Sequence, residues 1–189
     1  MPDHMRQWVN LSGPSARQFT CGYCGNLVSS NQGWFTNNDP QEYIYVCPHC
    51  TRPTYFGDFN QVPGVGPGND VGHLPQEISA LYKEARQCVA AGAPTAAVLS
   101  ARKLLMHIAV AQGAQPGANF LAYVEYLANS GYVPPNGKGW VDHIRKKGNE
   151  ANHEIKLMIP DDATELISFA EMLLKFIYEF PNRVPTATP

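Results

Sequence analysis

Apolar and polar residues alternate in short runs through the first sixty residues, whereas from Pro75 onward apolar residues recur every three or four positions. Alternation is the pattern of half-buried β-strands, and the longer period is that of amphipathic helices. A glycine- and proline-rich stretch, QVPGVGPGNDVGHLP, separates the two patterns and marks a boundary. The chain is therefore predicted to be α+β, with a small β unit over 1–60, a linker over 61–74, an all-α antiparallel bundle over 75–181 and a flexible tail over 182–189.

Two runs of the β unit predict strands. QEYIYVC and TYFGDF are rich in β-branched and aromatic residues, as strands are. The segment before them, NQGWFTNNDPQ, is polar and contains Gly33 and Pro40, which favour turns. We therefore expect this segment to form the tip of a hairpin.

Five segments carry the helical period, and short connections between them favour antiparallel packing. They are Pro75–Ala91, Pro94–Gln112, Asn119–Asn129, Trp140–Met158 and Asp161–Phe180. The last of them is predicted to bury an apolar stripe made of Ile167, Ala170, Leu174, Ile177 and Tyr178.

Composition narrows the class of protein. Of the 189 residues, 44% are hydrophobic and 16% charged, which is typical of a globular protein and excludes a disordered one. The net charge of −2 gives the whole chain no general attraction to nucleic acid, so such binding needs a local basic patch. No apolar run reaches the length of a membrane span, and the first residues lack a signal peptide's apolar segment. We expect a cytoplasmic protein with no membrane contact.

Four cysteines stand in two C-x2-C pairs, Cys21 with Cys24 and Cys47 with Cys50, separated by 22 residues. Each pair can point two thiolates at one tetrahedral centre, and a positive φ at Gly25 would relieve crowding after the first pair. The pattern predicts a structural zinc ion held by all four cysteines, with no vacant position for a catalytic water. The alternative, a thioredoxin-type redox dithiol, normally opens a helix, and no helical pattern follows either pair.

Two further residues near or beyond these pairs are not assigned to the zinc site. His49 lies inside the second C-x2-C turn, so its side chain is expected to point away from the metal and lie at the surface. Cys88 falls in a helical segment, where it is expected to act as a small buried apolar residue.

A polar row interrupts the fourth helical segment. Val141 and Ile144 share the face that looks into the bundle, while Arg145, Asn149 and His153 follow one another along its shoulder. One interpretation is a hydrogen-bonded network that fixes helix packing, with Arg102 of the second helix taking part. The other is a site in which Arg145 holds an anionic group and His153 transfers a proton. These two residues are about 12 Å apart along a straight helix, so Asn149 with His153 is the more compact pair.

The same residues carry a resemblance to a known family. The run Ala101-Arg102-Lys103-Leu104-Leu105, then Gly113, then Ile144-Arg145-x3-Asn149-x3-His153, resembles domain of unknown function 4145, a helical domain grouped with the HEPN superfamily. The resemblance covers about Leu74 to Phe180, and an N-terminal zinc ribbon is a common companion of that domain. Many HEPN members are dimeric ribonucleases of toxin–antitoxin, abortive-infection and restriction systems, with an Arg-x4–6-His motif. By resemblance, Arg145 and His153 would be catalytic and Asn149 their polar neighbour.

Two departures from that pattern shape the functional hypotheses. Seven residues separate Arg145 from His153, which is longer than the nuclease motif, and Met106 stands where the family tends to have Glu. The first hypothesis is therefore a zinc-ribbon and HEPN-like module that binds nucleic acid or a protein partner, as a homodimer, in a prokaryotic or phage defence or regulatory context. The alternative is a metal-independent ribonuclease. The basic cluster of Lys138, Arg145, Lys146 and Lys147 borders the polar row and favours an anionic ligand such as RNA.

Overall fold

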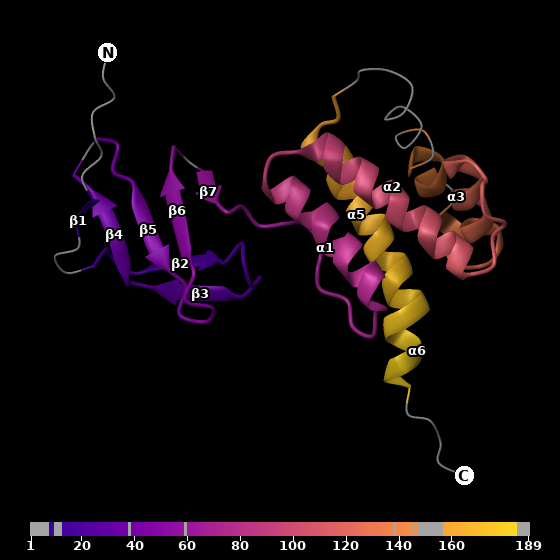
Figure 1. Cartoon of the computed structure of the whole chain (residues 1–189), viewed down its shortest axis with the longest axis horizontal. Helices are drawn as coiled ribbons and strands as arrows, with labels where there is room; N and C mark the ends of the chain where they lie inside the picture. Colours follow the sequence, from indigo (N-terminus) through magenta and orange to yellow (C-terminus); the bar gives the residue numbers. More distant parts are fainter. Residues whose placement is uncertain are drawn as a thin grey trace, which may run out of the picture. The chain divides into compact units, whose positions relative to one another are not determined.

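The structure, a computed structural model, describes residues 8–9, 13–37, 39–58, 60–137, 139–144, 146 and 157–184. Strands come first along the chain and helices follow, so the protein is α+β as predicted (Figure 1). It divides into two compact units, Met1–Gly66 and Pro67–Pro189. No helix in the described ranges is both long and apolar enough to cross a membrane.

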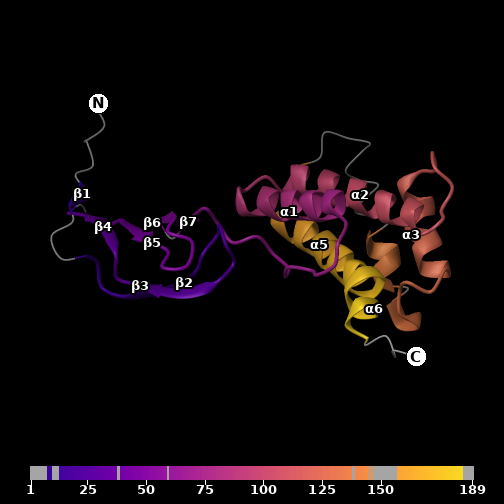
Figure 2. The same ribbon diagram turned by 60° about the horizontal axis from the view of Figure 1, so that its bottom comes forward.

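The first unit, here called the ribbon, contains two antiparallel sheets. The larger has the order β1-β4-β5-β6-β7, and the smaller pairs β2 with β3 and lies beneath it in Figure 2. The bounds are β1 Trp8–Val9, β2 Arg17–Thr20, β3 Leu27–Ser30, β4 Gly33–Thr36, β5 Tyr43–Val46, β6 Pro53–Gly57 and β7 Asn60–Val62.

The structure confirms the two predicted strands as β5 and β6, but corrects the predicted hairpin tip. Gly33–Thr36 is the strand β4, which pairs with β5, and the chain reverses only between Thr36 and Tyr43. A side chain at Gly33 would place its Cβ 1.8 Å from the Ile44 carbonyl oxygen. The glycine thus permits close strand pairing here, whereas the sequence pattern suggested a turn.

The ribbon has a small aromatic core. Phe19, Tyr45 and Phe56 are buried, and their ring centroids lie 5.2 to 6.0 Å apart in tilted or edge-on contacts. Tyr45 also donates a hydrogen bond from its hydroxyl to the Ser15 carbonyl oxygen. Trp34 stays 38% exposed, so the ribbon does not bury all of its aromatic residues.

The second unit, here called the helical unit, packs around α2. Helix α2 contacts α1, α3 and α5, which lie around it in both views (Figures 1 and 2). Its apolar face is fully buried at Leu104, Leu105 and Ile108. The bounds are α1 Gln76–Ala90, α2 Pro94–Ala111, α3 Phe120–Asn129, the 3₁₀ turn η1 Pro135–Gly137, α5 Pro160–Leu174, the π-helical turn η2 Lys175–Glu179, and α6 Phe180–Arg183.

The first three predicted helices are confirmed as α1, α2 and α3, within about a residue at each end. The last predicted helix differs, because its continuous α pattern is replaced by a π-helical turn over Lys175–Glu179. Of the fourth predicted helix, residues 139–144 and 146 are helical. Its end was predicted at about Met158, and residues 157–159 are not helical.

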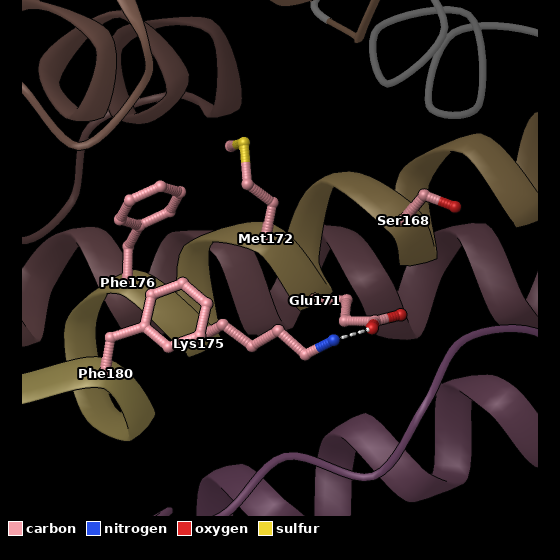
Figure 3. A pocket seen from close by; sticks show the side chains of 6 residues that line it. All are labelled: Ser168, Glu171, Met172, Lys175, Phe176 and Phe180. Carbon is pink, nitrogen blue, oxygen red and sulfur yellow. Dashed lines mark hydrogen bonds and ion pairs between the residues drawn. The ribbon is translucent and has the colours of Figure 1, made fainter. Parts of the chain in front are cut away.

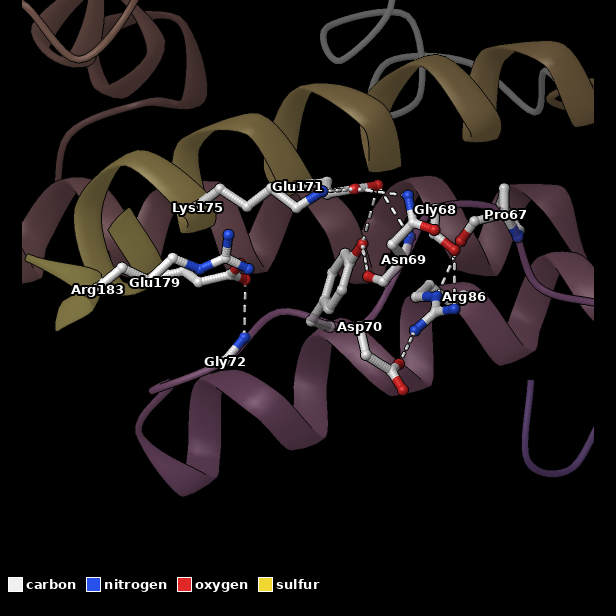
Figure 4. Close-up of polar contacts among 11 residues, drawn as sticks. Pro67, Gly68, Asn69, Asp70, Gly72, Arg86, Glu171, Lys175, Glu179 and Arg183 are labelled. Atoms are coloured by element: carbon white, nitrogen blue, oxygen red, sulfur yellow. Dashed lines mark hydrogen bonds and ion pairs between the residues drawn. The ribbon is translucent and has the colours of Figure 1, made fainter. Parts of the chain in front are cut away.

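Residues 67–72, here called the strap, are tied to the helical unit by charged side chains (Figure 4). Arg86 of α1 donates from Nε to the Pro67 carbonyl and from Nη2 to the Gly68 carbonyl, both at 2.9 Å. Glu171 of α5 accepts 3.0 Å hydrogen bonds from the backbone amide and the side-chain amide of Asn69. Glu179 accepts a 2.9 Å hydrogen bond from the Gly72 amide. The strap therefore belongs structurally to the helical unit.

Candidate metal centre

The four predicted zinc ligands come together in the ribbon. The Sγ atoms of Cys21, Cys24, Cys47 and Cys50 all lie within 4.8 Å of one another, and all four are free thiols. Cys21 and Cys50 are 3.7 Å apart, and Cys24 and Cys47 are 3.9 Å apart. Four sulfurs bound tetrahedrally to zinc at about 2.3 Å lie about 3.8 Å from one another, so this donor set fits a zinc ion.

Both C-x2-C pairs are held by the same backbone pattern, which we call a knuckle. The amide of Cys21 donates to the Asn26 carbonyl, and the amide of Gly25 donates back to the Cys21 carbonyl. In the second knuckle the amide of Cys47 donates to the Arg52 carbonyl, and that of Thr51 to the Cys47 carbonyl. Each knuckle thus presents its two sulfurs from one tight turn, and the two turns face each other across the cluster.

The two knuckles have different residues at the position where the turn has a positive φ. The fourth position after the first cysteine has a positive φ in both, 70° at Gly25 and 59° at Thr51. The positive φ expected at Gly25 is confirmed. Thr51 is β-branched and disfavours this conformation, and it donates a 2.7 Å hydrogen bond from Oγ1 to the Cys50 carbonyl. No pattern in the sequence marks Thr51 for this role.

The cluster lies partly inside the ribbon's core. Cys21 and Cys47 are fully buried and pack with Phe19, Tyr45 and Phe56, while Cys24 and Cys50 are half-buried. Burying thiolates among aromatic rings is unfavourable unless a cation neutralises them. The surroundings therefore favour a bound metal over four free thiolates.

The pKa values of the metal-free thiols also favour a bound cation. Burial opposes ionisation of Cys24, but hydrogen bonds from Asn26, Cys21 and Cys50 lower its pKa to about 6. The pKa of Cys50 is raised to about 12: the Arg52 amide lowers it, but burial and the neighbouring cysteines outweigh that hydrogen bond. Neighbouring groups thus stabilise the thiolate of Cys24, which forms first, and disfavour ionisation of Cys50, which forms its thiolate last. A divalent cation removes that opposition, since it attracts all four thiolates at once.

The chain that follows β7 packs against the first knuckle. A Cβ at Gly22 would lie 2.4 Å from both the Pro63 and the Gly64 carbonyl oxygens. Gln61 of β7 donates from Nε2 to the Thr20 carbonyl at 2.7 Å, just before Cys21. Gly22, the first residue inside the C-x2-C turn, is therefore required for close approach rather than for a positive φ.

His49 is exposed, as predicted, and is not part of the cysteine cluster. Its Nδ1 lies 3.1 Å from the Asn26 side-chain nitrogen, so it links the second knuckle to the first. On the same surface, the Arg52 guanidinium lies over the Tyr23 ring, 5.1 Å from its centroid. These contacts are polar and solvent-facing, as expected for residues that orient the knuckles without binding the metal.

The predicted polar row cannot be placed, because Arg145, Asn149 and His153 lie outside the described residues. Val141 and Ile144, on the same helical segment, are buried as predicted. Arg102 of α2 is also buried, with its guanidinium 4.6 Å from the centroid of the Phe120 ring, and burial lowers its pKa. Cys88, predicted to be a buried apolar residue, is half-buried and packs against the helical core.

The fold and the site define a protein in which a ribbon with a cluster of four cysteines, close enough together to hold one metal ion, precedes a helical unit. A family model described as Domain of unknown function (DUF4145) matches residues 83–188, and the chain belongs to that family. The match begins inside α1 and covers the rest of the helical unit, so the cysteine cluster lies outside it. No curated protein and no solved structure matches the chain.

Proposed function

We propose that the four cysteines bind one structural zinc ion, and that the chain is a non-catalytic module that binds a macromolecular partner. The observation that carries the zinc proposal is the set of four sulfurs within 4.8 Å of one another, with two separations, 3.7 and 3.9 Å, that match the edges of a ZnS4 tetrahedron. A tetrahedral set of four sulfurs suits zinc or iron, and a closed set leaves no position for a substrate. Zinc here would stabilise the ribbon and take no part in chemistry.

The charge of the ribbon favours a protein partner over nucleic acid at that unit. Residues 1–66 contain three arginines against four acidic residues, Asp3, Asp39, Glu42 and Asp58. A zinc ion with four thiolates adds two further negative charges. Nucleic-acid binding depends on neutralising phosphates with basic side chains, which this unit lacks.

For the helical unit, the resemblance to HEPN domains supports a HEPN-like fold and a homodimer formed near the polar row. It also supports a prokaryotic or phage defence or regulatory context. RNA binding here would rely on the basic cluster, of which Lys146 is exposed. RNA is therefore the competing partner class for the helical unit.

The alternative function is a metal-independent ribonuclease in which His153 acts as general acid or base and Arg145 stabilises the phosphorane charge. Its support is the family resemblance and the basic cluster around Arg145. The seven-residue gap between Arg145 and His153 argues against a ribonuclease. Both side chains must contact one phosphate, and on a straight helix the two residues are about 12 Å apart. Asn149 would then be the polar group beside His153.

The test of the zinc proposal is the metal content of the purified full chain, measured by inductively coupled plasma mass spectrometry. We expect one zinc per chain, loss of that zinc in Cys47→Ser, and its retention in the matched control Cys88→Ser. Iron in place of zinc, or zinc retained in Cys47→Ser, would contradict the proposal.

The test of the binding proposal uses labelled tRNA, mRNA and single-stranded RNA incubated with wild type and with His153→Ala. We expect the RNA to stay intact without metal and to bind weakly. Cleavage that disappears in His153→Ala would establish the ribonuclease instead. Tight binding without cleavage would make RNA the partner.

A further inference from the structure

The end of the helical unit carries an apolar pocket of about 340 Å³ on its outer surface (Figure 3). It is lined by Met172 of α5, Phe176 of η2 and Phe180 of α6, together with Ser168, Glu171 and Lys175. The rings of Phe176 and Phe180 meet edge to face, with centroids 5.4 Å apart and planes 80° apart. Both remain open to solvent, at 49% and 41% exposure.

Phe176 and Phe180 are exposed side by side and in contact, whereas a single exposed apolar side chain needs no explanation. Met172, Phe176 and Phe180 follow one another at four-residue steps, so they form a stripe on one side of the continuous α5-η2-α6 helix. Of the apolar stripe predicted for this helix, Ile167, Ala170 and Leu174 are buried in the core, and Ile177 and Tyr178 are half-buried against it. The exposed stripe is therefore separate from the core-facing one.

The charges beside the pocket are unevenly exposed. Glu171 and Glu179 turn toward the strap, where they accept hydrogen bonds from Asn69 and Gly72, and their side chains are only 13% and 7% exposed (Figure 4). Their ion-pair partners remain more open, Lys175 at 26% and Arg183 at 66%. The two carboxylates are thus more buried than their cationic partners, and Arg183 is the most exposed of the four charged groups.

These cations border the aromatic rings directly. Lys175 lines the pocket, and the Arg183 guanidinium lies over the Phe180 ring, 5.9 Å from its centroid. Lys175 is paired with Glu171 and is only 26% exposed, whereas Arg183 is 66% exposed and can pair with a further carboxylate in addition to Glu179. An apolar anchor that enters the pocket therefore lies beside one accessible cation. Such a positive edge favours acidic partners and disfavours basic ones.

We propose that this pocket docks an amphipathic helical segment of a partner protein, with a large apolar side chain packed against the exposed faces of Phe176 and Phe180 and an acidic side chain against Arg183. This is the helix-in-groove mode of recognition. The proposal rests on the proposed binding function and assigns its partner class. A second copy of this chain is a poorer occupant, because it would bring another exposed Arg183 to the interface.

The experiment identifies peptides that bind the pocket, by panning a phage-displayed library of random peptides against the zinc-loaded full chain. The same library is panned against the Phe176→Ser/Phe180→Ser double variant and against Leu99→Ser. Leu99 lies on α2 and is 44% exposed, so its variant is a matched control for losing an exposed apolar side chain. Helical circular dichroism and zinc content establish that all three proteins are folded.

We expect peptides enriched on wild type and on Leu99→Ser to carry Leu, Phe, Trp or Met at helical spacing with neighbouring Asp or Glu. A synthesised peptide of this kind should lose at least about thirtyfold in affinity on the double variant, as for the loss of buried aromatic anchors. It should lose about two- to fivefold on Arg183→Gln, as for an exposed ion pair.

Three outcomes would overturn the inference. They are the absence of any enriched peptide, equal enrichment on the double variant, and enrichment of basic in place of acidic peptides. Concentration-dependent self-association that the double variant abolishes, measured by sedimentation, would assign the pocket to a second copy instead. If the chain contains one zinc yet no peptide is enriched, only this inference fails. If peptides are enriched but no zinc is present, only the zinc proposal fails.

Discussion

The ribbon and the helical unit are stabilised in different ways. In the described part of the ribbon, the buried apolar cluster has five members, and two of them are the ligand cysteines Cys21 and Cys47. The corresponding cluster of the helical unit has 26 members, centred on α2. A core of three aromatic rings is too small to fold a unit of this size, whereas the helical core is ordinary for its length. If the four cysteines bind zinc as proposed, the ribbon depends on that metal for its stability, whereas the helical unit depends on hydrophobic burial.

Removal of the metal is expected to produce the largest effect, and only in the ribbon. Structural zinc contributes about 10–16 kcal/mol to small zinc-dependent folds, which exceeds any contribution the ribbon's core can make. Chelation, or Cys47→Ser, should abolish the ribbon's dispersed amide signals in heteronuclear NMR spectra while ellipticity at 222 nm persists. Cys88→Ser should leave both signals unchanged. Loss of ribbon and helices together would show that the two units fold as one.

A substitution in the helical core should destabilise the helical unit and leave the ribbon unchanged. Leu104 is fully buried on α2, and Leu104→Ala should lower the free energy of unfolding of the helical unit by about 2–5 kcal/mol. Zinc content and the ribbon's NMR signals should stay as in wild type. Thermal and urea unfolding followed by ellipticity measure the loss, with the exposed Leu99→Ala as control. A change in zinc affinity in Leu104→Ala would contradict the independence of the two units.

A smaller effect is expected where the strap joins the helical unit. Burial alone would raise the pKa of Glu171, but hydrogen bonds from Lys175 and Asn69 outweigh it and hold the pKa below its usual value. A carboxyl group with a lowered pKa stabilises the fold above its unfolded-state pKa, and this contribution is lost as the pH falls through the folded value. Glu171→Gln should therefore cost about 1–3 kcal/mol at neutral pH and little in acid.

The measurement for the strap is the free energy of unfolding from pH 7 down to pH 3, from urea titrations. The difference between wild type and Glu171→Gln should shrink as the pH drops below about 4.5, the usual pKa of a glutamate. Glu84→Gln, at an exposed position of α1, serves as the control and should show no such trend. A difference that stays constant with pH would mean that the charge of Glu171 is not what holds the strap.

Sequence patterns predict the features that are encoded locally. Two C-x2-C pairs indicate a cysteine cluster, and the three-to-four-residue period places α1, α2 and α3. The short strands β2 and β3 were not predicted, because RQFT and LVSS are too short and polar to show alternation by themselves. The hydrogen bonds from Asn69 to Glu171 join residues 102 positions apart, a distance at which no periodicity can act. Arg145, Asn149 and His153 remain predictions.

The smallest expected effects compare the two knuckles. Gly25 has φ 70°, and a Cβ added there would have no atom within 4 Å, so Gly25→Ala adds conformational strain but no clash. The expected cost is about 1 kcal/mol, the usual penalty for a side chain in the left-handed region. Thr51 has φ 59° with a β-branched side chain, so Thr51→Gly removes that strain. It also removes the hydrogen bond from Thr51 Oγ1 to the Cys50 carbonyl, which limits the gain.

The two substitutions should therefore differ in their effect on zinc affinity. Zinc affinity measured by competition with a chromogenic chelator reports the strain, because the positive φ is needed only in the metal-binding turn. We expect Gly25→Ala to weaken zinc binding about fivefold and Thr51→Gly to leave it equal or slightly stronger. If Thr51→Gly weakened binding as much as Gly25→Ala, the threonine hydroxyl would matter more than backbone strain. The second knuckle would then be held by its side chain, and the first by its backbone alone.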